Sequence, residues 1–310
     1  MGLMPILHSN RGMDMSWLIY AILGVILLGA APVFAKSGMR KCSSDFTAAV
    51  YGTALFIAVN CMVSFTGTSL DLSQMEKTAF MYLLFSGIAI GASWVCCFRA
   101  LKRAPINAVI PVLEASLIIE IIAGIVIFGD GLSVNKIVIL VLLTAGTICM
   151  ALQTNRKRKR TKKRKGMWLS YALGAMLFIG LATIFGRIGL CDIDEYMKSL
   201  ICYAVALIMV WVVTFATGSQ IAMRSISFLD GICVILSGAC VGGAQFCFYK
   251  AKLLSGGFHI EIIALFDLAA AVLFGYVFMK EQLSTKKVFG MILMLAGFLF
   301  WHMNLPEIPL

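Results

Sequence analysis

The stretch "WLIYAILG" at residues 17–24 returns as "WLSYALGA" at residues 168–175, 151 positions later. The same offset aligns the two parts of the chain without a gap far beyond these eight residues. Apolar residues match easily by chance, whereas glycines, tryptophans and loop residues at one fixed offset do not. The matched pairs include Trp17 with Trp168, Tyr20 with Tyr171, Gly29 with Gly180, Gly67 with Gly218, Lys136 with Lys287 and Gly146 with Gly297. The chain is therefore predicted to contain two copies of one structural unit.

The composition predicts that both units lie in a membrane. Of the 310 residues, 61% are hydrophobic and only 13% are charged, whereas globular proteins average about 25% charged residues. Apolar segments recur at close to the length of about 20 residues that a helix needs to cross a bilayer. Alternation with a period of two is absent, so a β-barrel is not expected. The expected spans are 16–38, 46–66, 78–100, 105–128, 134–152, 167–189, 197–217, 229–252, 257–279 and 286–303.

Each unit contains five of these segments, and five is an odd number. The second unit must therefore enter the membrane from the side opposite to the first. The predicted fold is an all-α integral membrane protein with ten transmembrane helices, arranged as two inverted-topology five-helix repeats. The expected boundaries are 1–155 for the first repeat, 156–165 for a basic linker and 166–310 for the second repeat. In secondary transporters built this way, the substrate site lies near the membrane midplane between the repeats.

The linker is the most charged part of the chain, because nine of its ten residues are Lys or Arg. Basic loops are retained in the cytoplasm. The loops on the linker side carry 19 Lys and Arg residues and the other side carries 7. The linker is therefore predicted to be cytoplasmic, with both termini outside and anionic lipid headgroups bound at residues 156–165. Nucleic acid is not an expected partner, since no recognition element accompanies the basic run.

Two short stretches at the ends of the fourth and ninth segments carry a family resemblance. "VIFGDGLS" (126–133) and "VFMKEQLS" (277–284) each close an apolar run with an acidic turn, at Asp130 and Glu281. With the duplication, they resemble the drug/metabolite transporter superfamily, specifically its EamA-like branch. Asp130 replaces the usual Glu of that turn, and Lys280 replaces the usual Gly. The resemblance implies transport of a small solute, and also termini in the cytoplasm, opposite to the charge count.

The fourth and ninth segments also contain acidic residues far from either end. "PVLEASLIIEIIAG" (111–124) includes Glu114 and Glu120, and "FHIEIIALFDLAA" (258–270) includes Glu261 and Asp267. A carboxylate at mid-helix costs about 2.5–3.5 kcal/mol on insertion scales. We therefore expect these four residues to bind the substrate or couple transport to protons, with Glu261 the shallowest. The structural alternative is a protonated, hydrogen-bonded carboxyl group, or a side chain that snorkels.

Other residues in the apolar segments have weaker functional claims. Glycines four apart on one helix face allow a second helix to approach closely, and helix packing is their expected role. These glycines are Gly87, Gly91, Gly238 and Gly242. Candidate cavity-lining residues, for which packing is the alternative, are Trp94, Gln245, Tyr249 and His259.

Four basic residues near segment ends correspond across the repeat. Lys36 aligns with Arg187, and Arg99 aligns with Lys250. Long basic side chains near the end of a span usually extend their charged group to the interface. Snorkelling is therefore the expected behaviour of all four.

Several functional classes lack support in the sequence. The ten cysteines include no Cys-x-x-Cys motif and have no histidine at ligand spacing, so neither a metal site nor a structural disulfide is expected. No nucleotide-binding loop or nucleophile elbow is present, and neither a cofactor nor enzymatic activity is expected. The leading hypothesis is a secondary transporter in the cytoplasmic membrane for a small metabolite, amine-bearing or cationic because buried acids outnumber bases. The alternative is a lipid-handling, flippase-like protein or an accessory membrane protein. A second copy of the chain is a further candidate partner.

Overall fold

The structure is a computed structural model that describes residues 16–66, 76–152, 162–189, 195–221, 226–255, 263 and 266–302. Within these ranges the chain forms helices and no β-strand. The first half contains α1 (Ser16–Gly38), α2 (Ser44–Thr66), α3 (Lys77–Leu101), α4 (Ile106–Glu114), α5 (Ser116–Val126) and α6 (Val134–Leu152). The second half contains α7 (Lys162–Ile188), α8 (Glu195–Ala216), α9 (Phe228–Ser255), α11 (Asp267–Met279) and α12 (Thr285–His302).

The predicted membrane class is confirmed. Among the described residues, eight helical segments are long and apolar enough to cross a membrane, with α4 and α5 together forming one of them. Helix α11 is apolar but shorter, and α12 has 18 residues. The described helix ends lie within three residues of the expected ones, apart from the starts of α7 and α11. Helix α11 begins at Asp267, ten residues after the expected start of the ninth segment. Helix α7 begins at Lys162, because the last residues of the basic linker continue it beyond the apolar segment.

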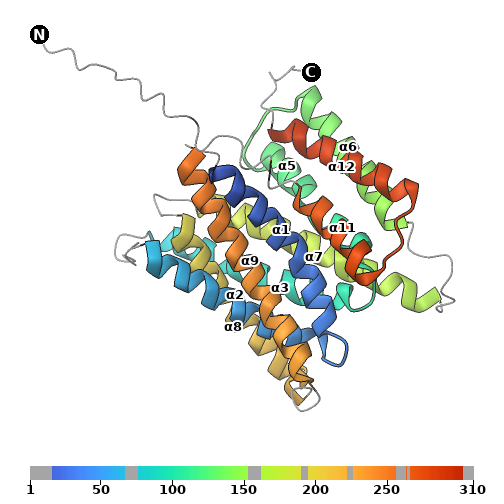
Figure 1. The fold of residues 1–310 in the computed structure, drawn as a ribbon. Helices are drawn as coiled ribbons and strands as arrows, with labels where there is room; N and C mark the ends of the chain where they lie inside the picture. The colour runs from blue at the N-terminus through green and yellow to red at the C-terminus, as the bar shows by residue number, and fades with distance from the viewer. Residues whose placement is uncertain are drawn as a thin grey trace, which may run out of the picture.

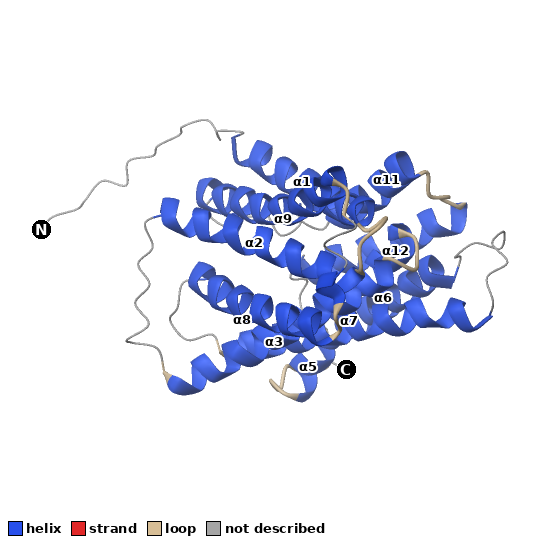
Figure 2. Ribbon diagram, turned by 90° about the horizontal axis from the view of Figure 1, so that it is seen from below, coloured by secondary structure: helices blue, strands red, loops and turns tan. Residues whose placement is uncertain are grey.

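The helices pack in pairs that combine the two halves of the chain. Helices α1 and α9 lie side by side, as do α3 and α7 (Figures 1 and 2), and in the view of Figure 1 these four occupy the middle of the molecule. Helices α2 and α8 form one edge of the bundle, and α6 and α12 form the other. Helices α4, α5 and α11 lie between the middle and the second edge.

The contacts of one half recur in the other at the offset of 151 residues. The Ser86 hydroxyl donates a hydrogen bond to the Ala182 carbonyl oxygen at 2.9 Å, and Ser237 donates to Ala31 at 2.8 Å. Each of these bonds becomes the other when both residue numbers are shifted by 151. The two halves are therefore packed around equivalent contacts.

Helices α1 and α7 end at opposite ends of α3. Lys36, near the end of α1, donates a hydrogen bond at 2.7 Å to the carbonyl oxygen of Ala104, just after α3. Gly189, after the end of α7, instead lies against Ala79 in the first turn of α3. Helix α3 has 25 residues and is therefore about 37 Å long. We call the end with Lys36 and Ala104 the linker end, because α7 also begins there.

The helix of the fourth segment is interrupted between α4 and α5. Ala115 separates them, with backbone angles φ −66° and ψ 0°. Pro111 lies one turn earlier, and proline removes one backbone hydrogen bond and clashes with the preceding turn. The interruption places Glu114 at the end of a helix rather than within one. Discontinuous helices of this kind form the binding sites of many transporters.

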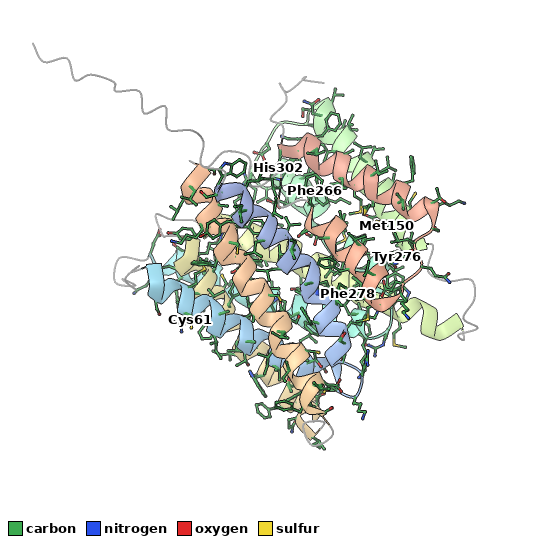
Figure 3. The ribbon with its side chains drawn as sticks, viewed as in Figure 1. Cys61, Met150, Phe266, Tyr276, Phe278 and His302 are labelled. Atoms are coloured by element: carbon green, nitrogen blue, oxygen red, sulfur yellow. The ribbon has the colours of Figure 1, made fainter. Side chains whose placement is uncertain are left out.

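The outer surface of the bundle is apolar. Phe228 is 82% exposed, Ile19 is 67% exposed and Phe278 is 67% exposed. Tyr276 and Phe278 both project from α11 (Figure 3). Apolar side chains that face outward from a bundle of long helices are the pattern expected where lipid covers the protein.

Candidate functional site: an acidic cavity between the two halves

A cavity of about 240 Å³ lies where the two halves meet. Helices α1, α2 and α3 and the start of the interrupted segment border it from the first half, and α9 and α11 border it from the second half. Glu114 and Asp267 both line it. The other polar or aromatic lining residues are Tyr51, Cys97, Phe98 and Ser237.

The two carboxyl groups reach the cavity from two helix ends that point in opposite directions. Glu114 is the last residue of α4, and Asp267 is the first residue of α11. A helix N-terminus stabilises a negative charge and a helix C-terminus disfavours one. Asp267 is therefore better placed than Glu114 to carry a negative charge.

Among the described residues that line this cavity there is no Lys, Arg or His. Most of the remaining lining is aliphatic, from residues such as Leu28, Ala31 and Val241. Two acidic groups in an apolar surrounding without a basic partner favour the binding of a positively charged group or of protons. The cavity is thus suited to a small cation.

The structure separates the remaining acidic candidates from this pair. Glu120 is partly buried on α5 and does not line the cavity. Glu261 and His259 lie outside the described residues. Of the four acidic residues expected from the sequence, Glu114 and Asp267 are thus the two that the described structure brings together.

The polar and aromatic candidates mostly lie one layer behind the cavity wall. Trp94 packs edge-to-face against Tyr51, with ring centroids 5.4 Å apart, and its other neighbour is Tyr203 at 5.8 Å. The side-chain amide of Gln245 donates a hydrogen bond to the Tyr203 hydroxyl. Tyr249 lies on α9 but not in the cavity lining. Trp94 therefore packs against Tyr51 and Gln245 binds Tyr203, and neither Trp94 nor Gln245 lines the cavity.

Sequence reasoning missed Tyr51, Cys97 and Ser237 as lining residues. Ser237 could have been predicted from the sequence, because it matches Ser86 at the repeat offset and precedes Gly238 of the predicted small-residue pattern. Tyr51 and Cys97 carried none, since one aromatic or thiol in an apolar helix is common.

The four glycines of the small-residue pattern lie at helix crossings. Gly87 and Gly91 contact α8, through Val205 and Ala206 respectively. The other two glycines contact α2, Gly238 at Tyr51 and Gly242 at Ala58. The α3–α8 and α9–α2 crossings are equivalent in the two halves.

Basic residues near the helix ends form ion pairs, where the sequence led us to expect snorkelling. Lys36 pairs with Glu281 at 2.9 Å. Arg99 binds Asp45 through two nitrogens, at 2.8 and 2.7 Å. Arg187 lies 3.9 Å from Asp130. Lys250, the counterpart of Arg99, instead lies over the ring of Phe246.

Possible metal and redox groups were also considered in the described ranges. These ranges contain no group of three or more His, Cys, Asp or Glu residues that could hold a metal ion. The nine cysteines that they include are free thiols.

The sequence profile of the EamA-like transporter family matches residues 15–152 and again residues 166–302. The fold and this double match define a multi-pass membrane transporter of the drug/metabolite transporter class. The chain belongs to the EamA-like transporter family.

One curated protein and one solved structure are also similar to this chain. A protein of Sinorhizobium sp described as "Uncharacterized transporter in cobO 3'region" is 29% identical over 139 residues, which are 45% of this chain and 99% of that protein. A solved structure described only as "Crystal structure of protein" superposes with a TM-score of 0.61 at 13% identity, over 93% of this chain and 96% of that one. The second likeness concerns the fold alone.

Proposed function

We propose that this protein is a secondary transporter that moves a small amine-bearing or cationic metabolite across the cytoplasmic membrane by alternating access. Glu114 and Asp267 are the residues that bind the positive charge of the solute or exchange it for protons. One observation carries the proposal: two carboxyl groups, one from each half of the chain, line the same cavity, and none of its lining residues in the described ranges is basic.

The energetics support a use for these acids. Each mid-membrane carboxylate costs about 2.5–3.5 kcal/mol on insertion scales. Two like charges that share an apolar site are harder still to ionise together, so a proton or a cation must neutralise one of them. The cavity of about 240 Å³ is smaller than the roughly 300–1,000 Å³ of sites for drug-sized ligands. A small solute fits these properties.

The proposed architecture has ten spans in two inverted repeats, 1–155 and 166–310, joined by the linker 156–165. The positions of the α1 and α7 ends, at opposite ends of α3, support the inversion. The α4–α5 break at Glu114 and the start of α11 at Asp267 support a site near the midplane. In alternating access the cavity opens to one side of the membrane at a time.

The first experiment identifies a solute by thermal shift of the purified protein against a panel of small primary amines, with the matching neutral amides as controls. Transport of the best amine is then measured in proteoliposomes, both as gradient-driven uptake and as exchange. The variants are Glu114→Gln, Asp267→Asn and Glu120→Gln, and the exposed Glu76→Gln serves as the control.

A residue that binds the amine should lose both transport modes when its charge is removed. A residue that only carries protons should lose uptake and keep exchange, since exchange needs no net proton movement. We expect Glu114→Gln and Asp267→Asn to fall into one of these classes and Glu120→Gln to be less affected, because it does not line the cavity. Normal transport by all three variants would contradict the roles given to these acids and place the solute site elsewhere. A parent protein that transports none of the amines would instead favour a lipid-handling protein.

A further inference from the structure

The acidic turns that carry the family resemblance take part in two equivalent ion pairs. Lys36 of the first half pairs with Glu281 of the second, and Arg187 of the second half pairs with Asp130 of the first. Each pair becomes the other when its residue numbers are shifted by 151. The first pair lies at the linker end of α3, beside Ala104. The second lies at the opposite end, because Gly189, close to Arg187 in the chain, contacts the first turn of α3.

The linker-end pair is part of a dense hydrogen-bond network. The Lys36 ammonium lies 2.9 Å from Glu281 Oε1 and also donates to the Ala104 carbonyl oxygen at 2.7 Å. The backbone N–H groups of Ile106 and Asn107 donate to the two Glu281 oxygens at 2.7 and 3.0 Å. A carboxylate from the second half therefore caps the N-terminus of α4, which belongs to the first half. This position favours a negative charge.

Asn107 and Lys287 extend the same network. The fully buried Asn107 donates from its side chain to the Gln282 carbonyl oxygen at 3.2 Å. It accepts a hydrogen bond at 2.8 Å from the ammonium of Lys287, which is 3% exposed. Five residues of this network, Lys36, Ala104, Asn107, Glu281 and Lys287, are named here the clasp. The clasp joins the start of α4 to the segment after α11.

The equivalent pair at the opposite end is looser. Arg187 Nη1 and Asp130 Oδ2 are 3.9 Å apart, and the two side chains are 47% and 36% exposed, against 24% and 8% for Lys36 and Glu281. The Arg187 guanidinium lies 4.4 Å from the centre of the Phe128 ring. Residues 257 and 258, which match the capped N–H groups of the clasp, lie outside the described residues.

The clasp and the acidic cavity lie at opposite ends of helices α4 and α11. Helices α4 and α11 pack side by side, the clasp holds the start of α4 against the end of α11, and their other ends carry Glu114 and Asp267. Two lining residues adjoin the clasp along the chain, Ala35 next to Lys36 and Leu101 just before Ala104. The clasp thus lies next to the linker end of the cavity and fixes the two helices that present its acids.

We propose that the two ion pairs are the two gates of the cavity, with the clasp closed in this structure and the Arg187–Asp130 gate loosened. The inference rests on the proposed transport function. Because the two halves are built alike, each can adopt the arrangement of the other, which would tighten Arg187 onto Asp130 and release Lys36 from Glu281. Packed interfaces with two alternative arrangements are the usual basis of such transitions. During transport, the closed gate alternates between the two ends.

Cys97 reports which gate is open, because its thiol lines the cavity. The other nine cysteines are replaced by Ser, and the protein is placed in vesicles of known orientation. A membrane-impermeant methanethiosulfonate reagent is then added from one side at a time, and the rate of Cys97 modification is measured. The parent protein should react faster from the end of Arg187 and Asp130 than from the linker end.

The variants form two matched pairs across the repeat. Lys36→Met and Glu281→Gln should raise the labelling rate from the linker end about tenfold, as the loss of one charged hydrogen bond predicts. Arg187→Met and Asp130→Asn should lower that rate, because the ion pair that they remove closes the opposite end when the linker end opens. Lys36→Met is the decisive variant, because it keeps the Glu281 cap on α4 and so preserves the start of that helix.

Either of two results would contradict the gate proposal. One is faster labelling of Cys97 in the parent protein from the linker end than from the other end. The other is a Lys36→Met protein that is monodisperse and has an unchanged labelling rate from the linker end. A labelling rate from the linker end that rises as much in Arg187→Met as in Lys36→Met would also contradict the proposal, because the two ion pairs would then not act at different ends. Labelling needs no solute, so it is independent of the transport assay. Normal transport by Glu114→Gln and Asp267→Asn, together with a labelling response at Lys36, would reject the proposed roles of these two acids and retain the gate proposal.

Discussion

At the scale of single residues, the Asp45–Arg99 pair shows how the bundle accommodates a charge near the end of a span. The Asp45 carboxylate accepts two hydrogen bonds from Arg99 and further bonds from Ser44 and Thr217. Arg99 also lies 5.8 Å from the ring centre of Tyr171. The repeat supplies no second copy of this pair, because position 196, which matches Asp45, is a tyrosine. The contact is therefore specific to the first half.

We predict that Asp45→Asn lowers the free energy of unfolding by about 1.5–3 kcal/mol, the usual contribution of hydrogen bonds to a charged group. The reason is that the Arg99 guanidinium loses a bidentate carboxylate partner and stays partly buried. The measurement is the melting temperature in detergent. The double variant Asp45→Asn, Arg99→Met should recover part of the loss, since it leaves no unpaired charge. Equal melting temperatures for the parent and Asp45→Asn would show that the pair is not a stabilising contact.

At the scale of helices, close approach at glycines holds the two halves together. A Cβ atom on Gly87 would lie 2.6 Å from the Val205 Cβ atom and 2.7 Å from the Cys202 carbonyl oxygen. On Gly242 it would lie 2.5 Å from the Ala58 Cβ atom. Real Cβ atoms do not approach so closely, so any larger residue must force these helices apart.

Gly87→Leu and Gly242→Leu are therefore expected to lower the yield of folded protein. The measurement is the monodisperse fraction on size-exclusion chromatography after identical expression. Gly131→Leu is the matched control, because the space around Gly131 is open, with no atom within 4 Å of a Cβ placed there. Normal yield with lost transport would instead place Gly87 or Gly242 in the solute site.

At the scale of the whole molecule, the start of α1 and the end of α12 lie on the same side of the bundle. The described chain begins at Ser16 of α1 and ends at His302 of α12, both at the end away from the basic linker (Figure 1). The linker end also carries the exposed Arg40, Lys41 and Lys102. Basic residues gather on the cytoplasmic side of membrane proteins.

The expected orientation has the linker in the cytoplasm and both termini outside. The measurement is a C-terminal fusion to paired reporters, one active only in the cytoplasm and one active only outside it. Replacing the Lys and Arg residues of 156–165 by Gln should give a mixture of orientations, because this run supplies 9 of the 19 basic residues on its side. A cytoplasmic C-terminus in the parent protein would contradict this prediction and match the usual orientation of the family.

The sequence by itself determined the membrane class, the positions of the helices and the duplication. These properties depend on local composition and on a comparison of the chain with itself, so they need no knowledge of packing. The span expected at 134–152 matches α6 residue for residue. The family followed from the same repeat and from the acidic turns at Asp130 and Glu281.

Only the tertiary structure decided which polar residues meet. Glu114, Glu120 and Asp267 looked alike in the sequence, and the break at Ala115 with the packing of α4 on α11 brings Glu114 and Asp267, not Glu120, to one cavity. Lys36 and Glu281 are 245 positions apart in the chain, and no local pattern pairs them. The physical reason is that the sequence places a carboxyl group within an apolar helix, whereas the surroundings and the partner of that group depend on how helices from the two halves cross.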